Sequence, residues 1–128
     1  MPEVVKRTER GWGGHFIAAS RCSFRRNTLL EYFDVKIVVS TVGGFVCKDT
    51  NDKLFIEQIG HNRYYETMAF YSDPKDARYH DADVQRPIDF NSKWGIDHID
   101  ADDEANDMHE AVVAELTTKL LAGEVEHG

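Results

Sequence analysis

The sequence contains little cysteine or proline and has no long apolar run. Its 128 residues include two cysteines and three prolines, and no stretch reaches the roughly 18 apolar residues that typify a membrane-spanning helix. The first residues also lack the apolar segment of a secretory signal peptide. We therefore expect a cytoplasmic protein in which Cys22 and Cys47 are reduced thiols, in preference to a disulfide.

Positive charge is scarce as well. The chain has 15 Lys and Arg residues against 23 Asp and Glu residues, which gives a formal net charge of -8. This surplus argues against a protein that wraps duplex nucleic acid or binds an anionic membrane. It leaves open a small nucleotide ligand, because a few clustered arginines can form a local positive pocket. The length and the 41% apolar content predict one domain over residues 1–128, with a loose arm at 1–13 and a frayed tail at 124–128.

The sequence also lacks catalytic and metal-binding motifs. It has neither G-x-S-x-G nor a phosphate-binding P-loop, and its six histidines form no H-x-x-x-H pair. Asp100, Asp102 and Glu104 have the alternate spacing of a calcium loop, but Ala105 and Ala111 stand where that loop requires Gly and Glu. Three further carboxylates that could form a catalytic pair are expected on the solvent face of strands: Glu66, Asp81 and Asp83. We therefore expect no enzyme, no cofactor and no metal.

The longest clean alternation in the chain runs from residue 62 to residue 71 and predicts a strand. One face would carry Tyr64, Glu66, Met68 and Phe70. The other face would carry Arg63, Tyr65, Thr67, Ala69 and Tyr71. Because both faces carry large side chains, we expect the central strand of an antiparallel sheet, with a helix on one face and a partner subunit or ligand on the other.

Shorter apolar segments predict the remaining strands, at residues 16–19, 21–24, 29–33, 35–42, 45–47, 54–56 and 79–90. Residues 25–28 read as a polar turn, and Pro87 places the last long strand at an edge or a bulge. Acidic residues from Asp102 open a helix, and Gly123 follows its last turn. The predicted fold is α+β, an antiparallel sheet of six to eight strands with one C-terminal helix packed against it.

Several groups are suited to a phosphate-bearing ligand. Guanidinium groups match phosphate geometry, and aromatic faces can stack on a base. The candidate ligand-binding residues are Arg25, Arg26, Asn27, Thr28, Arg63, Tyr64, Tyr65, Trp94, Asn106 and His109. The alternatives remain open: residues 25–28 could be a solvated turn, the tyrosines could be core or interface, and His109 could simply be partly buried.

Two arrangements of these candidates are expected. Arg63, Trp94 and Asn106 would converge on one small nucleotide, because strand ends and a helix start can meet at one edge of an α+β layer. Arg25 and Arg26 would face an anion, a cyclic oligonucleotide at a subunit junction. The number of large aromatics also exceeds what one helix can cover, which predicts a homo-oligomer.

The chain resembles the first type of Thoeris anti-defence protein, carried by phages and prophages. The resemblance spans roughly residues 14 to 122 and rests on five segments: 16–22, 26–32, 38–43, 62–68 and 105–113. It implies a protein of the bacterial host cytoplasm that binds a cyclic ADP-ribose isomer and sequesters it without cleavage. It also implies dimers or hexamers with nucleotide sites at subunit contacts and, in some members, a second site for cyclic di- or trinucleotides.

Under this resemblance, Arg63, Trp94 and Asn106 match the family's arginine, aromatic and amide contacts, whereas the arm around Trp12 has no match. Two other functions remain alternatives. One is an acidic inhibitor that binds a bacterial defence complex directly, and the other is a nucleotide hydrolase.

Overall fold

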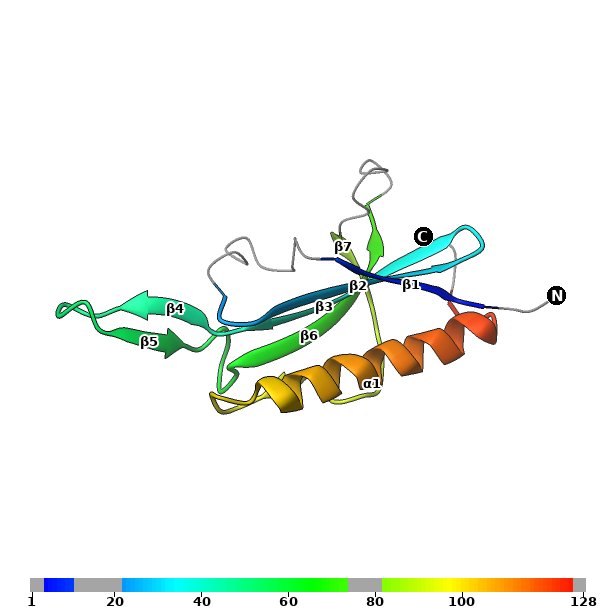
Figure 1. The fold of residues 1–128 in the computed structure, drawn as a ribbon. Coiled ribbons are helices and arrows are strands. Elements are labelled where there is room, and N and C mark those ends of the chain that lie inside the picture. The colour runs from blue at the N-terminus through cyan, green and yellow to red at the C-terminus, as the bar shows by residue number, and fades with distance from the viewer. Residues whose placement is uncertain (1–3, 11–21, 74–81, 126–128) are drawn as a thin grey trace.

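The computed structural model describes residues 4–10, 22–73 and 82–125, which form an antiparallel sheet with one long helix along its face (Figure 1). The six-stranded sheet has the order β1-β2-β3-β6-β7, and β8 also pairs with β6. Its strands are β1 (Lys6–Arg10), β2 (Arg25–Tyr32), β3 (Val35–Gly43), β6 (Tyr65–Ser72), β7 (Ala82–Ile88) and β8 (Gly95–Ile96). A separate hairpin of β4 (Phe45–Lys48) and β5 (Leu54–Glu57) projects beyond the sheet, and the helix is α1 (Asp102–Leu121). The predicted α+β fold is confirmed.

The predicted central strand is β6, and its pairing leaves an opening in the sheet. One edge of β6 pairs with β3 along its length, from Tyr65 to Tyr71. The other edge pairs with β8 at Tyr65 and Glu66, and with β7 only from Ala69 onward. Thr67 and Met68 therefore lie between the two partners. β7 is the outer strand there, with a register shift, as Pro87 predicted.

Both faces of the sheet are buried, as the alternation in β6 indicated. The face toward α1 forms a core of Leu30, Val35, Ile37, Val39, Ala69, Val112, Val113, Leu116 and Leu120. The opposite face buries Leu29, Val38, Val42 and Phe70. Each Val, Leu, Ile or Phe side chain among them contributes about 1.5 to 3 kcal/mol when fully buried. The apolar alternation therefore accounts for the central strands of this sheet and for the helix packed on them.

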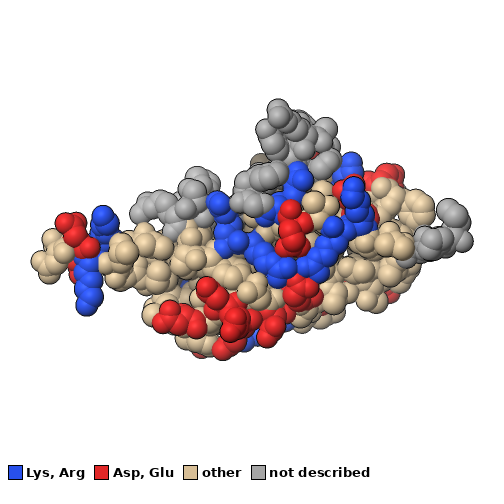
Figure 2. Space-filling model, in the orientation of Figure 1, with Lys and Arg blue, Asp and Glu red and all other residues tan. Residues whose placement is uncertain are grey.

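The prediction of a loose arm at residues 1–13 is wrong for Lys6–Arg10, which form edge strand β1 against β2. These residues are all polar, so they carry no hydrophobic pattern, and ion pairs to β2 and α1 hold the strand instead. Figure 2 shows the resulting band of Lys and Arg over β1 and β2, beside the acidic start of α1. Residues 1–3 and 11–13, with Trp12, lie outside the described residues, as does the predicted strand at 16–19. In the predicted tail, Val125 packs against the core, and residues 126–128 are not described.

The predicted turn at residues 25–28 is also wrong, because β2 begins at Arg25. Pairing with Thr41 and Val42 of β3 continues the ladder through these polar residues. Side chains alternate along a strand, so Arg26 and Thr28 face α1 whereas Arg25 and Asn27 face away. The four residues therefore do not form one surface.

The helix begins where predicted, but its first turn is held by Tyr65. The residue before the helix, Ala101, provides no side-chain cap. Instead, the Tyr65 hydroxyl accepts a hydrogen bond from Ala101 N at 3.0 Å and donates one to Asp102 Oδ1 at 2.7 Å. At the other end Gly123 adopts a φ of 71°, a conformation that favours glycine. No helix within the described residues combines the length and apolar character needed to cross a membrane.

Candidate functional site

Arg63 and Trp94 form a stacked pair at the opening beside β6. The guanidinium carbon of Arg63 lies 4.9 Å from the centre of the Trp94 ring, a cation–π contact. Arg63 precedes β6, and Trp94 precedes β8 and accepts a backbone hydrogen bond from Thr67 N at 2.9 Å. Trp94 remains 48% exposed. The pair is therefore held by the sheet and still reachable by a ligand.

Two glycines make room for the Arg63 side chain. A Cβ atom at Gly60 would lie 2.5 Å from Arg63 Nη2, and one at Gly95 would lie 3.0 Å from Arg63 Cδ. Gly60 belongs to a tight turn in which Arg63 N donates to Gly60 O at 3.1 Å. Asn62 in that turn has a positive φ of 56°. The guanidinium is thus confined by the backbone on one side and by Trp94 on another.

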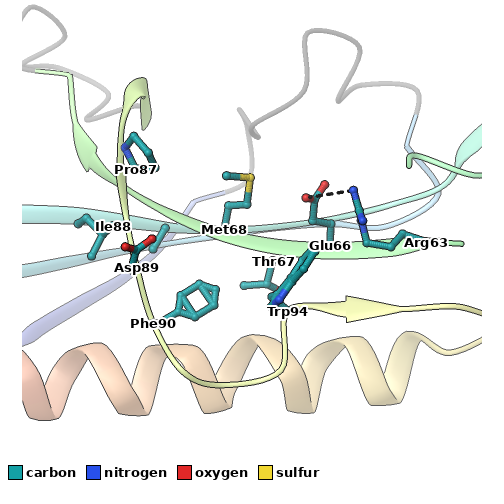
Figure 3. A pocket seen from close by; sticks show the side chains of 10 residues that line it. Arg63, Glu66, Thr67, Met68, Pro87, Ile88, Asp89, Phe90 and Trp94 are labelled. Atoms are coloured by element: carbon teal, nitrogen blue, oxygen red, sulfur yellow. Dashed lines mark ion pairs between the residues drawn. The ribbon is translucent and has the colours of Figure 1, made fainter. Parts of the chain in front are cut away.

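The pair forms the wall shared by two hollows. The first hollow, of about 340 Å³, spans the opening in the sheet, and Phe90 and Trp94 face the same space between β6 and α1 (Figure 3). It is lined by Arg63, Glu66, Thr67, Met68, Ala69, Pro87, Ile88, Asp89, Phe90 and Trp94. The second hollow, of about 420 Å³, is lined by Asn62, Arg63, Lys93, Trp94, Gly95, Ile96 and Asp97.

The two hollows differ in charge. Besides Arg63, the first contains the carboxylates of Glu66 and Asp89, and Glu66 Oε1 lies 3.9 Å from Arg63 Nη2. The second adds Lys93 to Arg63 and has Asp97 as its one carboxylate. No described residue accepts a hydrogen bond from the buried Arg63 Nε. An anionic group is therefore favoured in the second hollow, and an uncharged group with hydrogen-bond donors in the first.

The other predicted site residues lie elsewhere. Asn106 Oδ1 accepts a hydrogen bond from Arg26 Nη1 at 3.4 Å, on the β2 side of α1. Tyr65 is buried at the start of the helix, where burial and then its bond to Asp102 raise its pKa to about 12. Tyr64 lines a third hollow, of about 550 Å³, beside β5. Of the three residues expected to converge, the structure brings only Arg63 and Trp94 together.

Arg26 faces anions, but they belong to this chain. Arg26 Nε donates to Glu9 at 3.0 Å, and its Nη2 pairs with Glu110. Arg7 donates to Glu110 through both terminal nitrogens and to Glu9 through Nε. The bond from Arg7 is the main reason that the pKa of Glu110 falls to about 2. Two guanidinium groups and two carboxylates thus neutralise one another between β1, β2 and α1.

His109 is fully buried beside this cluster and connects the helix to three strands. Its Nε2 lies 2.7 Å from Thr28 Oγ1, which donates to Glu9 Oε2 at 2.7 Å. Its Nδ1 lies 2.7 Å from Thr41 Oγ1, which lies 2.6 Å from Thr67 Oγ1. Burial, and then the charge of Arg26, lower the pKa of His109 to about 4, so the ring is neutral at pH 7. The sequence placed His109 at the border of core and solvent, whereas it lies inside the protein.

These contacts determine which atom donates and which accepts in each hydrogen bond from Glu9 to Thr67. The Glu9 carboxylate can only accept, so the Thr28 hydroxyl donates to it and must accept from His109 Nε2–H. The unprotonated Nδ1 then accepts from Thr41, and Thr41 accepts from Thr67. The structure therefore assigns the Nε2–H tautomer to His109.

Sequence reasoning missed the parts of the site that only pairing brings together. Phe90 and Asp89 carried no motif, and the space that Gly60 and Gly95 leave for the Arg63 side chain arises only when the strands pair. Among the described residues, no group of three or more potential metal ligands forms a site. No protein-family model, curated protein or solved structure matches the chain.

Proposed function

We propose that the protein binds a cyclic ADP-ribose isomer at the Arg63–Trp94 pair and sequesters it without cleaving it. The observation that carries this proposal is the stacked cation and indole between two hollows of different charge. Such a ligand carries a base and an anionic pyrophosphate at different parts of one ring system, so it matches that division.

The base would occupy the first hollow and stack on Trp94, with Phe90 beside it. Stacking of this kind contributes about 1 to 3 kcal/mol per base. The carboxylates of Glu66 and Asp89 would accept hydrogen bonds from the base amine or from ribose hydroxyls. The same carboxylates would repel a phosphate, which fixes the orientation of the ligand.

The pyrophosphate would lie in the second hollow, against Arg63 and Lys93. A hydrogen bond between charged groups contributes about 1.5 to 3 kcal/mol, and both cations line this hollow. The two hollows, of about 340 and 420 Å³, each lie within the range of small-molecule sites, roughly 300 to 1,000 Å³.

Sequestration requires affinity and enclosure, not a nucleophile. Binding at signalling concentrations requires nanomolar affinity, about -12 kcal/mol. Trp94 is 48% exposed in a single chain, so a ligand stacked on it would remain open to water on one side. A second copy that covers this side would complete the enclosure, and the proposal therefore includes a homo-oligomer. In the cell, this activity would withhold the signal of the Thoeris defence system in a bacterial host.

One experiment separates this function from the alternatives. The protein is incubated with a cyclic ADP-ribose isomer, the free ligand is measured, and the protein is then heat-denatured. Depletion of free ligand followed by recovery of the intact molecule supports a sponge. Depletion with loss of the intact molecule indicates a hydrolase, and no depletion of any isomer tested favours a protein partner.

A further inference from the structure

A single carboxylate on α1 holds the loop between β7 and β8. Glu115 Oε2 accepts a hydrogen bond from Asn91 N at 2.7 Å. Its Oε1 accepts one from Ser92 N at 2.8 Å and one from Ser92 Oγ at 2.6 Å. Lys119, one helical turn away, lies 2.9 Å from Glu115 Oε2. One side chain therefore connects the helix to two consecutive loop residues.

The bonding capacity of this carboxylate is filled. An ionised carboxylate has about four lone-pair positions, and four donors converge on Glu115. Burial alone would raise the pKa of Glu115, but the bonds from Ser92, Asn91 and Lys119 outweigh it and lower the pKa to about 2. Glu115 is consequently ionised at any pH near neutrality, and its side chain is only 17% exposed.

The loop that Glu115 holds forms one wall of the first hollow. Between the end of β7 at Ile88 and the start of β8 at Gly95, the chain carries Asp89, Phe90 and Trp94, all of which line that hollow. A backbone hydrogen bond from Thr67 N to Trp94 O holds the far end of the loop. Phe90 packs against the core at the start of the loop. The next residues have no strand partner in the described part of the sheet, and the carboxylate of Glu115 bonds to two of them, Asn91 and Ser92.

We propose that Glu115 is a positioning residue for the nucleotide site, an inference that rests on the proposed function. It does not touch the ligand. It holds Phe90 and Trp94 at a fixed separation before the ligand arrives, so that binding does not have to order the loop. The residue that sets the geometry of the hollow thus lies on the helix, outside the hollow itself.

The test compares Glu115→Gln with Lys119→Met. Gln keeps the volume but has one acceptor oxygen, so it cannot accept from Asn91, Ser92 N and Ser92 Oγ together. Lys119→Met removes the helix ion pair and leaves all three loop bonds. By NMR, the Asn91 and Ser92 amides should exchange about tenfold faster in Glu115→Gln and at the wild-type rate in Lys119→Met.

Affinity for a cyclic ADP-ribose isomer, measured by calorimetry, should fall about tenfold in Glu115→Gln and remain unchanged in Lys119→Met. Equal losses in the two variants would mean that Glu115 acts only through helix stability, which overturns the proposal. Faster exchange with wild-type affinity would overturn it too, while the proposed function would stand. If the wild-type chain binds no isomer, the proposed function fails. Amide exchange alone then tests whether Glu115 positions the loop. An unchanged exchange rate of the Asn91 and Ser92 amides in Glu115→Gln would refute that role.

Discussion

His109 Nδ1 lies 2.7 Å from Thr41 Oγ1, so a helix side chain bonds directly to the middle of the sheet. Thr41 of β3 pairs with Thr67 of β6 in the strand register, and Thr28 of β2 lies on the other side of the imidazole. All four side chains have an exposure of 0%. A satisfied polar chain therefore crosses a core that is otherwise apolar, and its geometry fixes the helix against three strands.

Thr41→Val should destabilise the protein by about 2 to 4 kcal/mol. Valine has nearly the same shape, so the change creates no cavity. It leaves His109 Nδ1 without a donor and Thr67 without an acceptor, and both groups are buried. Chemical denaturation measures the loss. Thr118→Val is the matched control, because the Thr118 hydroxyl bonds only to its own helix at an exposed position, and it should change stability by less than about 0.5 kcal/mol.

The tautomer and protonation state of His109 can be read directly. Nitrogen-15 NMR of the imidazole should report a proton on Nε2 and none on Nδ1 at pH 7, with titration near pH 4. His98 is an internal control in the same spectrum, because its hydrogen bonds to Asp97 and Glu104 raise its pKa. A proton on Nδ1, or titration of His109 together with His98, would contradict the assigned chain of hydrogen bonds.

The folded protein should become less stable as the pH falls, because His109 is buried in its neutral form. The pKa of His109 is about 4 in the folded protein and 6.5 for an unperturbed histidine, so the unfolded chain takes up the proton first as the pH falls. The His109 contribution is therefore complete above pH 6.5 and is lost between pH 6.5 and 4, a change of about 3 kcal/mol. Urea denaturation at several pH values measures this slope, and a flat profile over that range would show that His109 is not held neutral.

Gly60→Ala should weaken nucleotide binding with little loss of stability. The new Cβ would meet Arg63 Nη2 at 2.5 Å, the end of a flexible side chain that can move away from Trp94. Gly44→Ala is the contrasting variant, because its Cβ would meet the backbone oxygen of Glu57 at 2.5 Å and should lower the melting temperature. The prediction is wrong if Gly60→Ala binds a cyclic ADP-ribose isomer as the wild type does.

The fold could be predicted from the sequence because its core elements carry strong periodic patterns. The alternation in β6 identifies the central strand, and the acidic start and the glycine after the last turn of α1 identify the helix, without any tertiary information. β1 and the start of β2 were missed because Lys6–Arg10 and Arg25–Thr28 are polar. They are held by strand pairing and ion pairs across the sheet, which local patterns do not contain.

The candidate site could be predicted only in part, because strand pairing and tertiary contacts decide which of its residues meet. Arg63 and Trp94 stood out as a cation and an indole near strand ends, and the antiparallel pairing of β6 with β8 brings them together. Asn106 was expected beside them, but its position on α1 directs it toward Arg26. Glu115 gave no sequence signal at all, because its role depends on a loop that lies more than twenty residues earlier in the chain.

The most direct test of the central claim is a calorimetric titration of the wild type, Trp94→Ala and Arg63→Ala with a panel of cyclic ADP-ribose isomers. We expect tight binding of at least one isomer by the wild type. The affinity of each variant should fall about tenfold or more, from lost stacking or a lost charged hydrogen bond, with nearly unchanged melting temperatures. Wild-type affinity in both variants, or no binding of any isomer by the wild type, would contradict the central claim.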